Sequence, residues 1–311
     1  PVGLPPSLSL STGATLTPTV TRTLTTTPTV ASTVAATPVT LTFTTLAAGW
    51  QHTCGVAAGG ATLCWGQNRQ GQLGDGTSAN VRTVPVAVAG GHRFSAVTAG
   101  WSHTCGLVQD GTAWCWGANF GGQLGDGTTD DRPAPVAVAG GRSYRSIAAG
   151  FAHTCAVALD GTAYCWGRND SGQLGDGTTT QALATAPAPV TGGARYVQVV
   201  AGETHACGLG QDGAARCWGG NWAGQVGDGT GATGLASTDR PAPVTVTGGL
   251  TFAKLTAWMH HTCGITGAGG VWCWGRNDTG QVGDGTPNAL GAPSPVVVAG
   301  GGAYGTIAAG G

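Results

Sequence analysis

The amino-acid sequence predicts an all-β protein, a β-propeller built from repeated four-stranded units. A frame that runs from a His-x-Cys triplet to a Cys-Trp-Gly triplet occurs five times in 311 residues. The histidine of this frame recurs at intervals of 51, 50, 52 and 56 residues, and short β-type runs alternate with glycine-rich turns. No stretch shows convincing helical periodicity. Repeats of this length with four short strands each are typical of propeller blades.

The segment before the repeats has a different composition. Residues 1–40 are rich in threonine, carry prolines at positions 18, 28 and 38, and contain no cysteine. Such a segment buries too little apolar surface to offset its ordering entropy, so we expect a disordered stalk or linker. The alternative is the end of a preceding β domain. The predicted division is 1–40 for the Thr/Pro-rich stalk and 41–311 for the repeats.

The strands can be placed in the second copy of the repeat. Residues 94–99, 103–108, 112–116 and 135–138 are the expected strands, and residues 117–128 form a glycine-rich loop. Residues 303–311 begin the same frame once more. We therefore expect five complete blades and the start of a sixth.

The two cysteines of each copy define a hairpin register. If Cys105 lies opposite Cys115, a three-residue loop remains at 109–111. Loops of this length commonly combine a type I turn with a left-handed residue, usually glycine. The position predicted to be left-handed is glycine in every copy: Gly60, Gly111, Gly161, Gly213 and Gly269.

This register places both cysteines of a copy at cross-strand distance on one face. Redox dithiols normally have two residues between their cysteines, as in Cys-x-x-Cys. A structural zinc site needs a fourth ligand besides one His and two Cys. We therefore favour disulfides over redox or zinc sites. The predicted pairs are Cys54–Cys64, Cys105–Cys115, Cys155–Cys165, Cys207–Cys217 and Cys263–Cys273. Disulfides in every copy indicate an extracellular, periplasmic or cell-surface location.

The complete frame resembles the RCC1 (regulator of chromosome condensation) repeat. In the second copy the matching residues are Gly100, His103, Gly111, Trp116-Gly117, Asn119, the run GQLG at 122–125, and Pro135-Val136. The resemblance covers about residues 41–311, and the added cysteines are similar to those of extracellular bacterial variants. It implies an RCC1-like β-propeller, usually of seven blades, of which this chain would be a fragment.

Charge and apolar patterning exclude several classes of protein. Charged residues make up 9% of the chain, 13 basic and 14 acidic. No basic stripe is present for a phosphate backbone, so we expect no nucleic-acid partner. No apolar run approaches the ~20 residues of a membrane span. We also expect no metal and no cofactor.

Positions shared by all copies are best explained by blade architecture. We expect the tryptophan of Cys-Trp-Gly to pack between blades and the histidine to bond backbone. The aspartate of Gly-Asp-Gly-Thr is expected to cap loop amides, with calcium ligation as the alternative. Trp258 departs from the frame, since the other copies have Gly49, Gly100, Gly150 and Gly202 there. If that glycine has a positive φ, tryptophan strains the fifth blade.

A binding site for one partner is expected where the copies differ. Two residues before the histidine stand Trp50, Trp101, Phe151, Glu203 and Met259. Directly after the asparagine of Trp-Gly-x-Asn stand Arg69, Phe120, Asp170, Trp222 and Asp278. Aromatic and arginine side chains suit interface hot spots. The candidate binding residues are therefore Trp50, Trp101, Phe151, Arg69, Phe120 and Trp222; the alternative for the first set is packing between blades.

Together these features predict a secreted or cell-surface module that binds a protein or glycan without catalysis. No single Ser, His or Asp departs from the repeats as an activated nucleophile would. The alternatives are inhibition of a secreted enzyme, an enzyme with its site at the channel mouth, and nucleotide exchange on a GTPase, as the resemblance to the founding family member implies.

Overall fold

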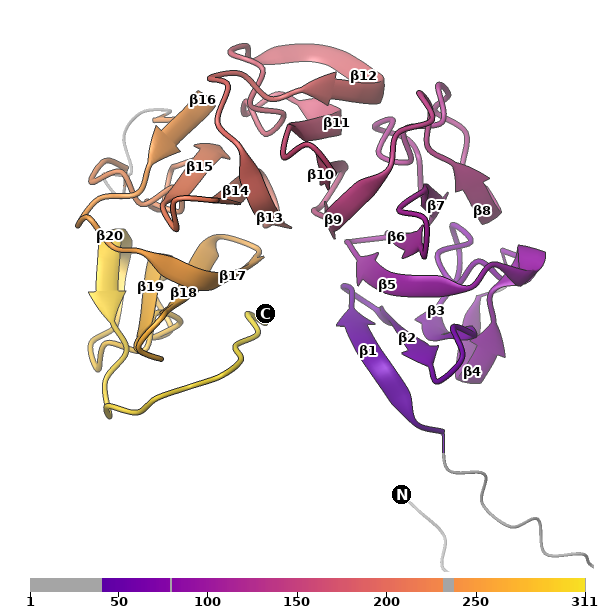
Figure 1. Cartoon of the computed structure of the whole chain (residues 1–311), viewed down its shortest axis with the longest axis horizontal. Coiled ribbons are helices and arrows are strands. Elements are labelled where there is room, and N and C mark those ends of the chain that lie inside the picture. Colours follow the sequence, from indigo (N-terminus) through magenta and orange to yellow (C-terminus); the bar gives the residue numbers. More distant parts are fainter. Residues whose placement is uncertain (1–40, 79, 232–237, 311) are drawn as a thin grey trace, which may run out of the picture. The chain divides into compact units, whose positions relative to one another are not determined.

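Five four-stranded antiparallel sheets make up the described part of the chain in this computed structural model. The structure describes residues 41–78, 80–231 and 238–310. In each sheet the strands follow one another in chain order, with the first strand innermost (Figure 1). The sheets are the predicted blades, and the all-β architecture is confirmed. The stalk predicted over residues 1–40 lies outside the described residues.

The strands of the blades are bounded as follows. Blade 1 consists of Phe43–Ala48 (β1), His52–Ala57 (β2), Thr62–Gln67 (β3) and Val81–Ala87 (β4). Blade 2 consists of Phe94–Ala99 (β5), His103–Val108 (β6), Ala113–Gly117 (β7) and Arg132–Ala137 (β8). Blade 3 consists of Tyr144–Ala149 (β9), His153–Ala158 (β10), Ala163–Asn169 (β11) and Thr180–Pro189 (β12). Blade 4 consists of Tyr196–Ala201 (β13), His205–Gly210 (β14), Ala215–Gly219 (β15) and Arg240–Thr245 (β16). Blade 5 consists of Phe252–Trp258 (β17), His261–Thr266 (β18), Val271–Asn277 (β19) and Asn288–Val297 (β20).

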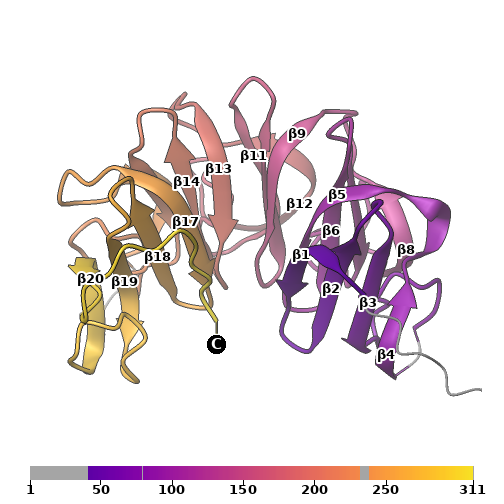
Figure 2. The ribbon, with the colours of Figure 1, turned by 60° about the horizontal axis from the view of Figure 1, so that its bottom comes forward.

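One 3-10 turn, η1 (Ala89–Gly91), joins blade 1 to blade 2, and no α-helix occurs in the described ranges. Accordingly, no helix there is long and apolar enough to cross a membrane. The first strands β1, β5, β9, β13 and β17 lie next to one another, as Figure 2 shows.

The central hairpin of each blade has the predicted register. Cys105 pairs with Cys115, the sulfur atoms are bonded, and the other four predicted cysteine pairs are bonded in the same way. Gly111 has a φ of 84° and its N–H donates to the carbonyl oxygen of Val108 at 2.9 Å. The left-handed glycine is thus required by the three-residue loop, as predicted.

The predicted bounds of the last two strands in blade 2 are wrong. The third strand is Ala113–Gly117 rather than residues 112–116, and the fourth is Arg132–Ala137 rather than residues 135–138. Gly117 pairs with Arg132, with a register shift between Gly117 and Cys115. This bulge lets Arg132 join the sheet although a proline follows it, because an outer strand tolerates a residue without an N–H donor.

Each contact between neighbouring blades centres on the tryptophan of Cys-Trp-Gly. Trp116 of blade 2 is fully buried in one cluster with Leu73 of blade 1. Its Nε1–H donates to the carbonyl oxygen of Gln72 at 3.0 Å. Trp166 and Trp218 make the corresponding bond at 2.9 and 3.0 Å. A buried indole adds large apolar area to each junction, as expected from the sequence, and a satisfied polar group to these three. The Nε1 of Trp274 at the fourth junction is buried without a hydrogen-bond partner among the described residues.

Three of the repeated histidines, His52, His103 and His205, bond the next blade rather than backbone, which corrects the prediction for them. His103 Nε2 lies 3.0 Å from Thr154 Oγ1, which lies 2.8 Å from the carbonyl oxygen of Gln123. Because the hydroxyl hydrogen is used on that carbonyl, His103 donates its Nε2–H to the threonine oxygen. His52 and His205 contact the next threonine in the same way, both at 2.8 Å.

The strain expected at Trp258 lies one residue later. Gly49 and its counterparts have no positive φ. Glycine is needed there for close approach, because a Cβ on Gly49 would lie 2.5 Å from both the carbonyl oxygen of Gly100 and the His52 ring. In blade 5 the strand continues, so that Trp258 pairs with His261. The turn between them is left with two residues, and Met259 takes a φ of 40°.

Residues 303–310 lie against blade 5 as the first strand of a next repeat would. Tyr304 N–H donates to the carbonyl oxygen of Gly269 at 3.0 Å, and Tyr144 N–H donates to Gly111 in the same way at 2.8 Å. The start of a sixth repeat is therefore in place. The number of blades in a complete ring stays a prediction.

Candidate binding face

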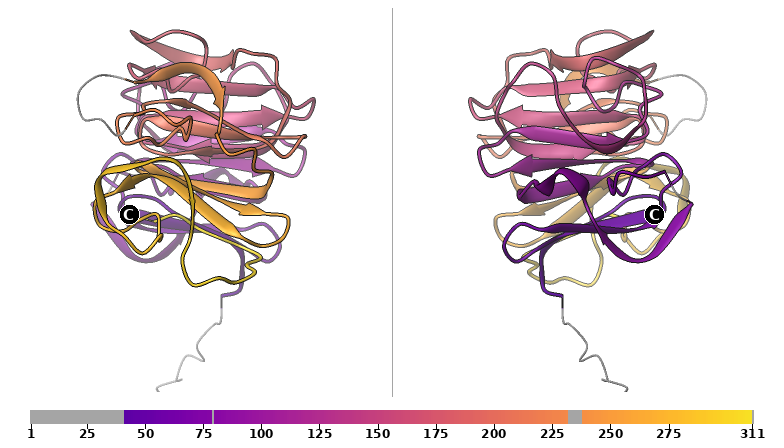
Figure 3. Two further views of the ribbon diagram at one scale, coloured as in Figure 1. Left: turned by 90° about the vertical axis from the view of Figure 1, so that its left-hand side faces the viewer. Right: turned by 90° about the vertical axis from the view of Figure 1, so that its right-hand side faces the viewer.

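The two sets of variable positions lie at the same end of the blades. In blade 2, His103 at the start of β6 pairs with Gly117 at the end of β7. The loop before His103 and the loop after Gly117 therefore leave the sheet side by side. The side views in Figure 3 show loops at both ends of the sheets. The variable loops share one end, and the hairpin loop 109–111 lies at the other.

Four candidate residues form a continuous row, which we call the aromatic rim: Trp50, Trp101, Phe151 and Phe120. The rings of Trp50 and Trp101 stack, with centroids 4.2 Å apart and planes 9° apart. Phe151 meets Trp101 edge-on at 4.8 Å and Phe120 at 6.3 Å. Trp50 and Phe120 are 43% and 52% exposed. The rim residues thus contact one another across blades and still present apolar surface to solvent.

The other two candidate residues lie outside this row. Trp222 is 48% exposed and contacts the ring of His260 in blade 5, with centroids 4.8 Å apart. Arg69 is exposed in the corresponding loop of blade 1. Among residues 41–310 as described, it makes no ion pair or cation–π contact.

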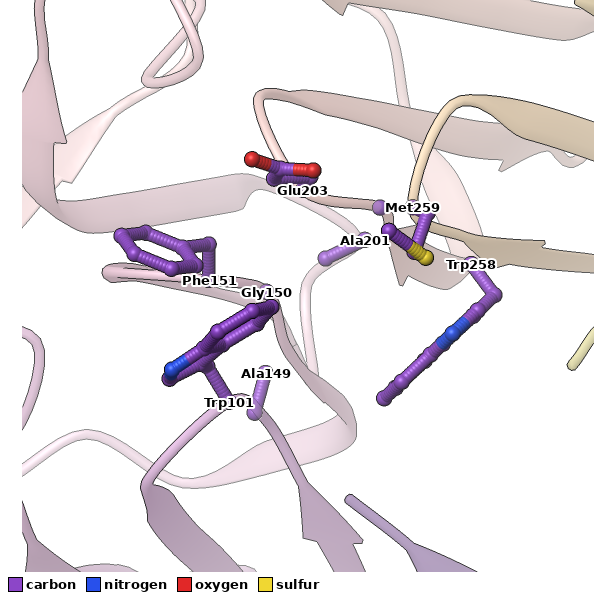
Figure 4. Close-up of a pocket in the computed structure, with 9 residues that line it drawn as sticks. Trp101, Ala149, Gly150, Phe151, Ala201, Glu203, Trp258 and Met259 are labelled. Atoms are coloured by element: carbon purple, nitrogen blue, oxygen red, sulfur yellow. The ribbon is translucent and has the colours of Figure 1, made fainter. Parts of the chain in front are cut away.

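A small hollow lies beside the rim, and we call it the Glu203 pocket (Figure 4). Trp101 and Phe151 stand on one side of it, and Trp258 and Met259 on the other. Glu203 lies between these two sides. The hollow measures about 20 Å³, enough for a group about the size of one water. The pocket therefore joins loops of blades 2, 3, 4 and 5.

Hydrogen bonds fix Glu203 to the turn of blade 5. Its backbone N–H donates to the carbonyl oxygen of Met259 at 2.7 Å. His260 Nε2 lies 3.0 Å from Glu203 Oε2. Burial lowers the pKa of His260, and the nearby Glu203 carboxylate opposes that effect. His260 is therefore neutral at pH 7 and donates its Nε2–H to the Glu203 carboxylate.

The sequence predicted binding residues in the loops that form this pocket, but it did not predict the pocket itself. Glu203 and Met259 stand at a predicted variable position, yet neither is an aromatic or arginine hot-spot type. Trp258 was noticed only as a departure from glycine, and His260 was missed. One signal was available: Glu203 and Met259 are the only glutamate and the only methionine in the chain.

The aspartates of the Gly-Asp-Gly-Thr loops have protein partners. Asp126 Oδ1 accepts from Thr128 N–H at 3.0 Å, as the capping prediction requires, and from Asn119 Nδ2 at 3.2 Å. Its Oδ2 pairs with Arg132 at 2.9 Å, a partner that sequence reasoning missed. The described residues contain no group of three or more His, Cys, Asp or Glu placed to hold a metal ion.

The inner strands border a larger hollow of about 410 Å³. Most of its described lining residues are of apolar type, such as Leu46, Val97 and Leu255, and none is His, Cys, Asp or Glu. Ser146 is part of this lining, and its Oγ accepts from Val199 N–H at 3.1 Å. No general base stands in this lining to activate that serine.

The repeated blades and their junctions agree with a comparison of the sequence with known families. The model of the RCC1-like domain matches residues 10–311. The chain belongs to the RCC1-like domain family. The resemblance drawn from the repeat frame is confirmed.

Relatives of this RCC1-like chain differ widely in length. It is 32% identical over 244 residues to the Ultraviolet-B receptor UVR8 of Arabidopsis thaliana, covering 77% of this chain and 42% of UVR8. It is 36% identical over 89 residues to the probable E3 ubiquitin-protein ligase HERC4 of Rattus norvegicus, covering 28% of this chain and 8% of HERC4. The chain thus spans less than half the length of these curated relatives.

Solved structures show the same fold. Yeast RCC1 (Prp20), in its complex with Kap60, matches with a TM-score of 0.73 and 22% identity over 85% of this chain and 65% of that one. Human WBSCR16 matches with a TM-score of 0.73 and 19% identity, over 85% and 68%. At such identities the likeness is one of fold alone.

Proposed function

We propose that this RCC1-like propeller is a non-catalytic binding module that engages a protein or glycan partner outside the cytoplasm. The observation that carries the proposal is the aromatic rim, a partly exposed row of rings on loops held by rigid blades. Aromatic side chains in such positions supply much of the binding energy at interfaces. Closely packed blades hold these loops in place before binding, which reduces the entropy lost on association.

Two further observations support this proposal. Five buried disulfides suit an oxidising compartment. The described lining of the central hollow lacks the side chains that act as general acids and bases. Both agree with binding, rather than catalysis, as the role of the chain.

A capture experiment tests the aromatic rim. Wild-type chain is immobilised and exposed to extracellular proteins and to a glycan array, beside a variant with Trp50→Ala, Trp101→Ala and Phe120→Ala. We expect a retained ligand whose affinity falls at least tenfold in the variant, since a hot-spot ring contributes about 2 kcal/mol or more. Val84→Ala is the control, because Val84 is 64% exposed on β4, outside the rim. Equal retention by all three chains would contradict the proposal.

A further inference from the structure

The Glu203 pocket combines three aromatic rings with one carboxylate. Trp101 and Phe151 stand across the hollow from Trp258. The faces of aromatic rings carry partial negative charge and attract cations, most strongly for tryptophan. Met259 adds a polarisable thioether that adapts to a bound group. A ring face that borders the hollow and the Glu203 carboxylate both favour a positively charged ligand.

The negative charge of Glu203 is available to such a ligand. The only basic side chain paired with Glu203 among the described residues is His260, which is neutral at pH 7 and contacts Oε2 as a hydrogen-bond donor. The neighbouring Arg276 is already bound to Asp278 by two hydrogen bonds of 2.8 and 2.5 Å. Glu203 Oε1 has no hydrogen-bond partner within the described ranges, and the side chain is 27% exposed. One carboxylate oxygen is therefore left for a donor that enters from solvent.

The size of the pocket and its single carboxylate, in an otherwise apolar lining, narrow the ligand class. A hollow of about 20 Å³ accepts a group about as large as one water. The ammonium of a lysine has this size and carries three donors. A sugar ring is larger and presents several hydroxyl groups, for which the pocket offers a single carboxylate. These properties favour a lysine of a protein partner over a glycan.

The backbone of blade 5 is specialised at this pocket. Met259 is the only residue other than glycine with a positive φ in the described part of the chain, at 40°. Its carbonyl oxygen accepts the N–H of Glu203 and so joins the turn of blade 5 to the Glu203 loop of blade 4. Non-glycine residues keep this conformation mainly where surrounding contacts enforce it, often at functional sites. This turn places Trp258 and Met259 opposite Trp101.

We propose that the Glu203 pocket receives the ammonium group of a lysine side chain from a protein partner. The inference rests on the proposed function, because it assigns a class of partner and one anchoring contact to the binding face. The aromatic rim lies beside the pocket and would bury apolar surface around that lysine. The carboxylate of Glu203 selects a cationic side chain, and the aromatic rim adds buried apolar area to the interface.

The single methionine of the chain provides a direct reporter. With [¹³C-methyl]methionine, the protein gives one methyl resonance, that of Met259 in the pocket wall. The probes are n-butylammonium, which reproduces a lysine side chain, and n-butanol, its neutral counterpart, at pH 7 and matched ionic strength. We expect a saturable shift with n-butylammonium at millimolar concentration. Binding of n-butanol should be roughly tenfold weaker.

A charge-removing variant tests the role of the carboxylate. Glu203→Gln keeps an oxygen that can accept from His260, and it should weaken n-butylammonium binding roughly fivefold. Asp130→Asn is the matched control, because it removes one exposed negative charge that does not line the pocket. Its affinity should equal that of wild type. The comparison of the two probes on wild-type protein stands even if Glu203→Gln does not fold.

The outcomes separate this inference from the proposed function. A third probe, n-propylguanidinium, reproduces an arginine side chain. The lysine assignment would be overturned by equal binding of n-butanol and n-butylammonium, by tighter binding of n-propylguanidinium than of n-butylammonium, or by no shift of the methyl resonance. If wild type still captures a ligand through the aromatic rim in that case, the proposed function stands without it. A saturable, Glu203-dependent response to n-butylammonium supports the inference, even where rim alanines leave capture unchanged and the proposed function fails.

Discussion

At the residue scale, one hydrogen bond differs between otherwise equivalent junctions. His103 bonds Thr154 of the next blade, but His153 faces a blade in which Ala206 replaces the threonine. His153 Nε2 is buried and has no hydrogen-bond partner in the described part of the chain. An unsatisfied buried donor costs free energy because folding removes its water. The junction between blades 3 and 4 therefore lacks a bond that three other junctions have.

Restoring this bond should stabilise the protein. We expect Ala206→Thr to raise the free energy of unfolding by about 1 kcal/mol, since the hydroxyl can bond His153 as in the other blades. Thr154→Ala is the matched reverse change and should lower it by about 1–3 kcal/mol, because it leaves His103 unsatisfied. Urea unfolding followed by tryptophan fluorescence gives both values. A destabilised Ala206→Thr would show that the space at this junction differs from that in the others.

At the scale of elements, the hairpins were predictable and the outer strands were not. A three-residue loop with a left-handed glycine leaves one register for Cys105 and Cys115, so local spacing was sufficient. The fourth strand starts earlier than expected at Arg132, because its pairing with Gly117 depends on a bulge and a distant loop. Local sequence does not encode such a register shift. The ion pair of Arg132 with Asp126 could not be predicted either, because it depends on the same register shift.

Each disulfide should stabilise its hairpin through the unfolded chain. Removing one pair with Cys105→Ala and Cys115→Ala opens a loop of ten residues' separation, which should cost about 2–3 kcal/mol by the entropic model. Denaturant titrations of wild type and variant measure this difference. A reductant breaks this disulfide in the unfolded wild-type chain and so removes the effect of the cross-link. In its presence, the difference in unfolding free energy between wild type and variant should fall to the part caused by lost packing. If it stays the same in reductant, the stabilisation comes from packing rather than cross-linking.

At the scale of the whole molecule, the repeat period was enough to predict the blades but not the pocket between them. Trp50 and Trp101 could be identified as a variable position, because equivalent residues come to one end of successive blades. Their stacking, and the cage around Glu203, depend on how neighbouring blades pack. The continuation of the strand to Trp258 was also unpredictable, since it depends on the pairing of Trp258 with His261.

Buried neutral histidines make the whole propeller sensitive to acid. Burial lowers the pKa of His52 to about 4 and of His103 to about 3, where the charges of His153 and His52 also contribute. Burial also lowers the pKa of His153 to about 4 and that of His205 well below its usual value. An unfolded histidine binds a proton near pH 6.5. Below that pH the unfolded chain therefore holds more protons than the folded one.

Stability should consequently be full above about pH 6.5 and fall as the pH decreases toward 4. Each histidine contributes a slope of about 1.4 kcal/mol per pH unit, so four together give about 5.5 kcal/mol per unit at the steepest. Carboxylates such as that of Asp212, whose pKa its bonds to Arg216 lower to about 2, add to the loss only below about pH 4. Urea titrations between pH 7.5 and 4.5 measure the slope.

His103→Gln tests which groups cause this slope. Glutamine can donate to Thr154 as His103 does but does not titrate, so the slope between pH 6.5 and 4.5 should fall by about 1.4 kcal/mol per pH unit. His92→Gln is the control, because His92 is partly exposed outside the junction row, with its ring tilted by 37° against that of Trp114. Its slope should match that of wild type. A free energy of unfolding that stays flat from pH 7 to pH 5 in wild type would show that the junction histidines take up protons without unfolding the blades.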